Sequence, residues 1–256
     1  PSSAASDVYK RQLYNMVDSI FIGHGVGPLA ISGLALTFPL MNLAAAFGSL
    51  VGVGAATLIS MRLGQRDYET AQRVLGNVLV LNLIIGISFG LAALLFLDPI
   101  LYFFGASENT ISYARDYMNV ILIGNVITHM YLGLNAVLRS SGFPKLAMYA
   151  TLASVVINCV LNPLFIFGFG WGIKGSAWAT VISQVISLTG QLIHFSRPKE
   201  LLHFKKGIYR LKSEIVKGIL YIGMSPFLMN LCSCLIVLLI NNGSVSYTHL
   251  TLPTTE

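Results

Sequence analysis

Charged residues are scarce in this 256-residue chain, making up 10% of it, against about 25% in an ordinary soluble domain. Hydrophobic residues make up 55%, and several apolar runs reach the roughly 20 residues that a helix needs to cross a bilayer. These runs do not alternate apolar and polar residues, as the strands of a membrane β-barrel would. The composition therefore predicts an all-α polytopic membrane protein.

Sequence motifs of common enzyme classes are also lacking. The chain has no HExxH, no GxSxG, no phosphate-binding GxxxxGK[ST] and no paired aspartates in an apolar run. We therefore expect neither enzyme activity nor a cofactor, and this chain by itself is not an ATP-driven pump. Cysteine is rare, and Cys159, Cys232 and Cys234 lie in apolar runs, where they are expected to pack as small residues.

The two ends of the chain share an unusual relationship at the level of DNA. The codons GAT GTG TAT AAG AGA CAG encode the DVYKRQ of residues 7–12, and their reverse complement encodes the VSYTH of residues 245–249. One short element in opposite orientations is typical of a transposase-type sequencing adapter. We therefore interpret 1–12 and 245–256 as adapter-derived scars that do not belong to the fold. We interpret the remainder as a fragment.

Seven apolar segments are predicted to span the membrane. They are a truncated first helix at 13–23, then 29–61, 74–97, 117–138, 146–167, 175–195 and 215–240. Glycine and proline lie between them, as expected for turns. Gly48 and Gly52, like Gly86 and Gly90, are four residues apart, a spacing that lets membrane helices approach closely.

Lysine and arginine are distributed unequally between the two sets of connections. One set and its flanks hold twelve, Arg62, Arg66, Arg73, Arg139, Lys145, Arg197, Lys199, Lys205, Lys206, Arg210, Lys212 and Lys217, whereas the other set holds only Arg115 and Lys174. This bias predicts that the basic connections are cytoplasmic and that the protein is a multi-pass protein of the inner (plasma) membrane. The connection at 197–213 is expected to contact anionic lipid, and nucleic acid is not an expected partner.

Asp18 is the one acidic residue predicted to lie in a helix core. Desolvation disfavours an ionised carboxylate, so Asp18 could hold a proton and release it when a cation arrives, or it could bind Na⁺ directly. The alternative is a structural acid hydrogen-bonded to a neighbouring helix. Polar groups in hydrocarbon are costly and commonly functional, and this favours the first interpretation.

Several uncharged polar residues accompany Asp18 in the apolar segments. Asn158 and Asn162 share one helix face, Asn135 lies in the fourth segment and Thr180 in the sixth. Their side-chain oxygens suit a hard monovalent cation, which Asp18, Asn158, Asn162 and Thr180 could bind together. Each could equally be a hydrogen bond between helices. Pro163 adds a helix break, which frees a backbone carbonyl.

Four further side chains have two interpretations. His129 is expected to be neutral and hydrogen-bonded rather than a proton relay. Tyr14, Met41 and Tyr131 could line an adaptable drug-binding cavity, although aromatic residues and methionine in apolar segments more often pack in the core.

Four stretches resemble the multidrug and toxic compound extrusion (MATE) transporters. They are LYNMVDSIFIGHGVGPLAISGLA (13–35), GVGAATLISMRLGQRDYETAQRVLGN (52–77), LNAVLRSSGFPKLAM (134–148) and INCVLNPLFIFGFGWGIKGSAWATVISQ (157–184). The resemblance implies a twelve-helix exporter with two six-helix lobes that are parallel repeats. It implies an amino-terminal lobe at 13–196, a basic inter-lobe loop at 197–213 and the first helix of a carboxy-terminal lobe at 214–244, with the rest of that lobe missing.

The resemblance also implies roles for particular residues. Asp18 matches the aspartate of the first helix, and Asn135, Asn158 and Thr180 match polar residues of the fourth, fifth and sixth helices. Asn162 departs from the pattern, because many relatives have aspartate there. The loss of that charge should weaken Na⁺ binding and leave Asp18 to couple transport alone.

The function that this implies is a secondary antiporter that exports amphipathic or cationic drugs, or toxic metabolites, in exchange for H⁺ or Na⁺. One alternative is a lipid-linked oligosaccharide flippase of the same superfamily. That function would require cationic residues in the cavity, and the apolar segments contain none in their cores. A membrane module without transport activity is the other alternative.

Overall fold

The protein is described by a computed structural model that covers residues 19–205 and 207–250, with side chains up to residue 236. Residues 19–25 are helical and are followed by α2 (Pro28–Gly64), α3 (Tyr68–Leu95), α4 (Leu97–Phe103), α5 (Ile111–Ile123), α6 (Asn125–Ser140), α7 (Pro144–Pro163), the π-helical turn η1 (Leu164–Gly168), α8 (Gly172–Phe195) and α9 (Ser213–Leu250). The described part of the chain contains no strand.

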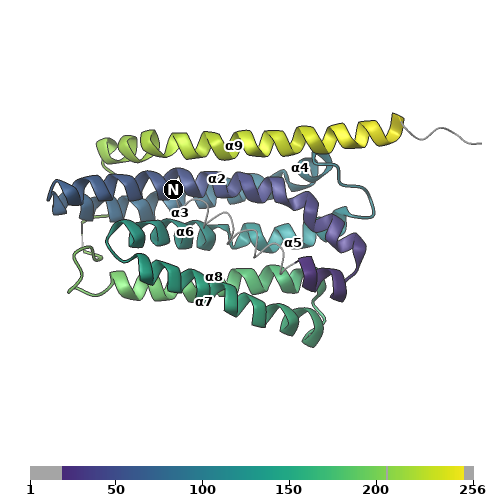
Figure 1. The fold of residues 1–256 in the computed structure, drawn as a ribbon, viewed down its shortest axis with the longest axis horizontal. Helices are drawn as coiled ribbons and strands as arrows, with labels where there is room; N and C mark the ends of the chain where they lie inside the picture. Colours follow the sequence, from purple (N-terminus) through teal and green to yellow (C-terminus); the bar gives the residue numbers. More distant parts are fainter. Residues whose placement is uncertain (1–18, 206, 251–256) are drawn as a thin grey trace, which may run out of the picture.

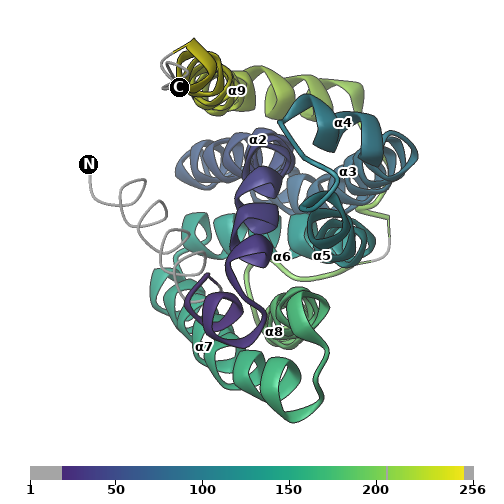
Figure 2. The same ribbon diagram turned by 90° about the vertical axis from the view of Figure 1, so that its right-hand side faces the viewer.

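The long helices run roughly along one common axis (Figure 1). In the end-on view of Figure 2, α9 lies at one edge, α7 and α8 lie at the opposite edge, and α2, α3 and α6 lie between them. α6 contacts α2, α3 and α8, while α9 packs mainly on α2. The all-α fold predicted from the composition is therefore confirmed.

Membrane-spanning potential is high for most of these helices. The stretches Pro28–Gly64, Tyr68–Leu95, Pro144–Gly168 and Ser213–Ile236 are long and apolar enough to cross a bilayer, and the bent pair Ile111–Ile123 and Asn125–Ser140 would make a fifth span. α8 is 24 residues long but is not among them. Its hydropathy is lowered by polar residues on several sides, which include Lys174, Gln184 and Gln191.

The predicted span 117–138 is wrong in detail, because it is two helices, α5 and α6, that meet at Gly124 with a bend of 55°. Glycine is a common site of helix kinks. A Cβ atom at Gly124 would lie 2.5 Å from Cγ2 of Val181 on α8. The bend therefore lets α8 pack directly against the backbone at this point. α5 also begins at Ile111, so Arg115 and Asp116 are helical rather than part of a loop.

The break after Pro163 lies where the sequence places it. α7 ends at Pro163, one π-helical turn follows, and Gly170 and Gly172 then adopt positive φ values of 68° and 56°. Proline weakens the preceding helical turn because it lacks an N–H and its ring crowds the carbonyl four residues earlier. Glycine makes the left-handed turn accessible, so the chain reverses into α8.

Two apolar clusters fill the bundle. One lies around α2, α3 and α6 and includes Val51, Leu75, Val78, Leu134 and Ile219. The other includes Leu34, Leu40, Tyr117, Met118 and Val181. On α7 the largest apolar side chains point outward instead, with Val156 61% and Val160 63% exposed. That pattern suits a helix whose outer face contacts lipid.

Close approach of backbones joins α2 to α9. A Cβ atom at Gly54 would overlap the carbonyl of Ile219, and one at Gly223 would overlap the carbonyl of Leu50. The predicted glycine pairs also lie at contacts. A Cβ atom at Gly52 would lie 3.5 Å from the Cα of Gly133, and one at Gly86 would lie 3.1 Å from the Cα of Val126. The sequence spacing therefore located glycines at helix contacts correctly, but it missed the closest crossing.

Candidate functional site

Asn158, Asn162 and Thr180 form one hydrogen-bonded cluster between α7 and α8. The Asn162 Nδ2 donates to Asn158 Oδ1 at 3.0 Å, and the Asn158 Nδ2 donates to Thr180 Oγ1 at 3.0 Å. Asn162 is fully buried, and the other two are nearly so. The two asparagines lie four residues apart, which places them on one face of α7. Three of the predicted site residues are therefore brought together in the interior of the lobe.

The cluster supplies oxygen atoms but no charge. Side-chain carbonyl and hydroxyl oxygens are the ligands that hard cations prefer, yet a buried cation without a compensating charge is costly. A cation at this position therefore requires a nearby carboxylate. The structure places none in residues 19–205 or 207–236 beside the cluster, and it shows no group of three or more His, Cys, Asp or Glu in that range that could hold a metal.

Asp18, the carboxylate that the sequence assigns to this site, lies outside the described residues, as does Tyr14. The described part of the first helix does reach the break that follows the cluster. A Cβ atom at Gly25 would meet Ile166 and Phe167, both in η1. The helical residues 19–25 and the turn after Asn162 are thus in contact.

Asn135 lies apart from this cluster. Its Nδ2 donates to the Ala147 carbonyl at 2.9 Å and to Thr151 Oγ1 at 3.3 Å, both in the first half of α7. Ala147 precedes Asn158 by three turns, or ~16 Å along an α-helix. The structure therefore assigns Asn135 to the contact between α6 and α7, near the end of the lobe that carries the basic connections.

The other sequence candidates lie among packing residues. Tyr131 is buried, and Met41 is half-buried and accepts a hydrogen bond from Thr37 Oγ1. His129 is almost fully buried, and its Nδ1 lies 2.9 Å from the carbonyl of Asn125, one helical turn earlier. A hydrogen-bonded histidine was the expected arrangement. Asn125 and Asn82 are also buried near α6 and were not predicted.

Four polar residues on α8 were also missed by the sequence interpretation. They are Ser183, Ser187, Gln191 and His194, all buried. Their spacing of four, four and three residues is typical of one helix face. That periodicity is visible in the sequence and could have identified them, but each residue is individually unremarkable in a membrane helix.

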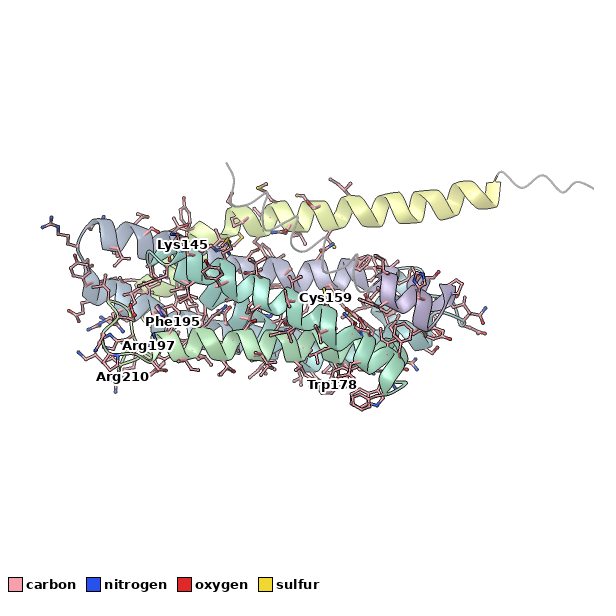
Figure 3. All side chains as sticks on the ribbon, turned by 60° about the horizontal axis from the view of Figure 1, so that its bottom comes forward. Lys145, Cys159, Trp178, Phe195, Arg197 and Arg210 are labelled. Carbon is pink, nitrogen blue, oxygen red and sulfur yellow. The ribbon has the colours of Figure 1, made fainter. Side chains whose placement is uncertain are left out.

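The two ends of the bundle differ in their electrostatics. At one end the two cations among the described residues are paired, because Arg115 bridges both oxygens of Asp98 at 2.8 and 2.7 Å and Lys174 lies 3.2 Å from Asp116. At the other end Lys145, Arg197 and Arg210 gather, away from Cys159 and Trp178 (Figure 3). The unequal distribution of cations in the sequence therefore corresponds to opposite ends of the folded bundle.

The basic connection 197–212 is anchored on α3. Asn77 is fully buried; its Nδ2 donates to the carbonyls of Ile208 at 3.4 Å and Arg210 at 3.2 Å, and its Oδ1 accepts from the Lys212 amide at 3.1 Å. A Cβ atom at the neighbouring Gly76 would overlap the Ile208 carbonyl. This connection is thus fixed on the bundle by several contacts.

Comparison with known proteins identifies close similarity over most of the chain. Residues 10–164 match the family model MatE. The multidrug export protein MepA of Staphylococcus haemolyticus (strain JCSC1435) is 32% identical over 217 residues, which is 85% of this chain and 48% of MepA. MepA of Staphylococcus aureus (strain MRSA252) is 30% identical over 219 residues, 86% of this chain and 49% of that protein.

Solved structures give the same result. The fold matches an inward-facing conformation of a multidrug resistance MATE family transporter of the MOP superfamily with a TM-score of 0.83, at 30% identity, over 87% of this chain and 51% of that one. An outward-facing conformation under the same description matches with a TM-score of 0.82, at 30% identity, over 88% and 50%. The chain spans about half the length of the relatives it matches.

Proposed function

The chain belongs to the MatE family, and from this premise we propose that the whole protein is a secondary antiporter. It would export amphipathic, often cationic drugs or toxic metabolites in exchange for H⁺ or Na⁺. The observation that carries the proposal is the buried hydrogen-bonded cluster of Asn158, Asn162 and Thr180 in helices with lipid-compatible outer faces. Buried polar groups at membrane depth typically mark an ion or substrate path.

In this proposal Asp18 binds the coupling ion and the cluster supplies neutral oxygens beside it. A site with one carboxylate is neutralised by a single H⁺ or Na⁺. Because a ligand shifts a conformational equilibrium only by its differential affinity for the two states, the ion and the drug must favour opposite-facing states. Asn162 is uncharged and keeps the proposed site at one negative charge.

The orientation follows the distribution of cations. We propose that the end with Lys145, Arg197 and Arg210 faces the cytoplasm of a plasma membrane, since an excess of lysine and arginine marks the cytoplasmic side. The missing carboxy-terminal lobe would pack against α9, whose membrane-spanning part is only 17% buried. The whole cavity for small-molecule substrates would then lie between the two lobes.

Handling of a lipid-linked oligosaccharide is disfavoured by the charges of the interior. A pyrophosphate head group needs cationic partners. Within residues 19–205 and 207–236, the buried polar side chains include no lysine and no arginine. An amphipathic organic cation is the better match for an interior that offers amide and hydroxyl oxygens.

The test is uptake of radiolabelled tetraphenylphosphonium into inverted vesicles that contain the full-length protein, with and without an imposed H⁺ or Na⁺ gradient. We expect gradient-dependent uptake that Asp18→Asn abolishes. Asp116→Asn is the matched control, because it removes a carboxylate whose partner is the exposed Lys174, and it should transport normally. Unchanged gradient dependence in Asp18→Asn would rule out the role given to Asp18.

A further inference from the structure

The second half of α8 buries a row of polar side chains before its last residue, Phe195, which belongs to an apolar cluster. From residue 182 to residue 194 the buried positions are Ser183, Ser187, Gln191 and His194, while Val185, Ile186 and Ile193 are exposed. The spacing puts the four polar residues on one face. α8 therefore has a polar stripe on its buried side, flanked by the partly buried Leu188 and Leu192, and an apolar outer face.

α7 presents a matching polar face in an antiparallel register. Its buried residues include Ser154 as well as Asn158 and Asn162. Two contacts fix the register, because Asn158 bonds Thr180 and the ring of Phe143 packs edge-on against His194 with centroids 4.6 Å apart. Moving from Asn158 toward Phe143 on α7 thus corresponds to moving from Thr180 toward His194 on α8.

Two more polar groups lie between these fixed points. Thr151 follows Ala147 by one turn of α7, and Asn135 of α6 bonds both residues. With the register above, this level of α7 faces Ser187 and Gln191. A continuous polar seam, defined here as Asn135, Thr151, Ser183, Ser187, Gln191 and His194, therefore leads from the Asn158–Thr180 cluster toward the basic end. It covers ~21 Å along α8 from Thr180 to His194.

Several atoms of the seam lack a protein partner. Ser187 Oγ, both amide atoms of Gln191 and His194 Nε2 are buried and accept or donate no hydrogen bond within the described part of the chain. Gln191 is 1% exposed. Buried polar groups without protein partners are typically satisfied by ordered water that bridges them. The unsatisfied atoms occur at successive turns of one helix face, so waters bonded to them would form a row.

The seam ends beside a surface cavity. Gly142, Phe143, Pro144, Lys145, Leu146 and Tyr149 line a cavity of about 420 Å³. Phe143 lies between the two features, because it lines this cavity and contacts the His194 ring. Its side chain therefore stands between the last residue of the seam and the solvent at the basic end.

We propose that the seam holds a chain of waters that carries protons between the Asn158–Thr180 cluster and the basic end of the lobe, with Phe143 as its apolar plug. Hydroxyl, amide and imidazole groups can relay H⁺ through bridging waters without a wide passage, whereas Na⁺ would need oxygen ligands along its whole path. The assignment of H⁺ rests on the antiport function proposed above. The hydration of the seam does not depend on it.

Hydration is tested by the reactivity of an introduced thiol in the full-length protein, with the native cysteines, including Cys159, Cys232 and Cys234, replaced. A thiol reacts as the thiolate and needs water to ionise. We expect Ser187→Cys to react with 2-aminoethyl methanethiosulfonate at least tenfold faster than Ala177→Cys. Ala177 is equally buried on the same helix but belongs to an apolar cluster. Equal rates would refute the hydrated seam.

The plug is tested in the same assay. Phe143→Ala should raise the reaction rate of Ser187→Cys several-fold from the basic side, and Phe143→Leu, which keeps an apolar side chain, should raise it less. If Phe143→Ala leaves the rate unchanged, Phe143 does not close the path.

The proton route is tested with Gln191→Leu. Leucine removes two relay atoms from the middle of the seam, so substrate-induced H⁺ release, followed with a pH-sensitive dye in vesicles, should fall at least tenfold. Binding of tetraphenylphosphonium to detergent-solubilised protein should remain unchanged and would show that the variant is folded. Full H⁺ release from Gln191→Leu would refute the route. Failure of the antiport proposal would instead appear as transport that is independent of Asp18, whatever the thiol reactivity at position 187.

Discussion

The helix pairs α2–α9 and α7–α8 are held together by opposite means. Between α2 and α9 the backbones nearly touch, at Gly54 against Ile219 and at Gly223 against Leu50. Between α7 and α8 the central contact is the bond from Asn158 to Thr180. Because lipid is as apolar as leucine, membrane helices associate through close packing or through polar contacts. Close backbone packing joins α9 to α2 on one side of the bundle, and a polar contact joins α7 to α8 on the other.

The difference has a consequence for motion. A glycine crossing has one favourable geometry, since any shift loses many small dispersion contacts at once. Amides and hydroxyls can exchange one partner for another, or for water, at little cost while polar groups remain nearby. A change at the Asn158–Thr180 cluster is therefore expected to alter α7–α8 first, while α2–α9 moves as a unit.

The largest effect should follow from breaking the glycine crossing. In Gly54→Leu the new side chain would collide with the Ile219 carbonyl, and overpacking of this kind costs ~3 kcal/mol. We expect a large loss of thermal stability and of monodisperse protein on size exclusion in detergent. Gly190→Ala on α8, where a Cβ meets nothing within 4 Å, is the control. A stable Gly54→Leu protein would show that the crossing is loose.

A smaller effect is expected in the polar pair. Asn158→Leu removes the donor to Thr180 and the acceptor for Asn162. A lost buried hydrogen bond costs about 1–3 kcal/mol when a polar partner is left behind. Stability should fall less than in Gly54→Leu, whereas ion-dependent transport should be abolished. Combined with Thr180→Val, the double-mutant cycle should give a coupling energy of ~1 kcal/mol in thermal unfolding. Additive effects would contradict a direct energetic contact.

The sequence predicted the polar contact between α7 and α8 better than the glycine crossing between α2 and α9. Helices and their breaks could be located because hydropathy, Gly170 and Pro163 are local signals. The pairing of Asn158 with Thr180 was anticipated in kind, since both are costly in lipid. The sequence did not show that Asn135 lies apart from these residues, because the level at which α6 meets α7 depends on tertiary packing. The bend at Gly124 was likewise not predicted, because a glycine only permits a kink and the packing of Gly124 against Val181, 57 positions away, is a tertiary contact.

The basic connection 197–212 is held on α3 both by close backbone packing and by polar contacts, at adjacent residues. Gly76 allows the Ile208 carbonyl to approach, and Asn77 bonds three backbone groups of the connection. Asn77→Ala should release 197–212 locally, so trypsin should cleave there several-fold faster under native conditions. Asn109→Ala, at an exposed turn, should not change the rate. Gly76→Ala should act in the same direction as Asn77→Ala if packing and polar contacts contribute jointly. Cleavage unchanged in Asn77→Ala would show that packing alone suffices.

The smallest effect concerns the first turn of α3, which lies outside both helix pairs. Asp67 caps this helix by accepting from the Thr70 amide at 3.1 Å. Hydrogen bonds from Thr70, with a smaller contribution from Arg62, lower the pKa of Asp67 below its ordinary value of 3.8. The folded protein therefore binds fewer protons there than the unfolded chain, and the cap's contribution is complete above the unfolded pKa and is lost as the pH falls through the lower, folded value.

Amide exchange at Thr70 should accordingly accelerate only below about pH 4, after correction for the intrinsic pH dependence of exchange. Asp67→Asn keeps a good capping side chain without a titrating group, so its corrected exchange should show no such step. The α2–α9 and α7–α8 amides should show no step in this pH range in either protein. A step that persisted in Asp67→Asn would belong to another acid. A step shared by all three regions would mean that the bundle opens as one unit. The glycine crossing and the polar pair would then not differ in how easily their helices move apart.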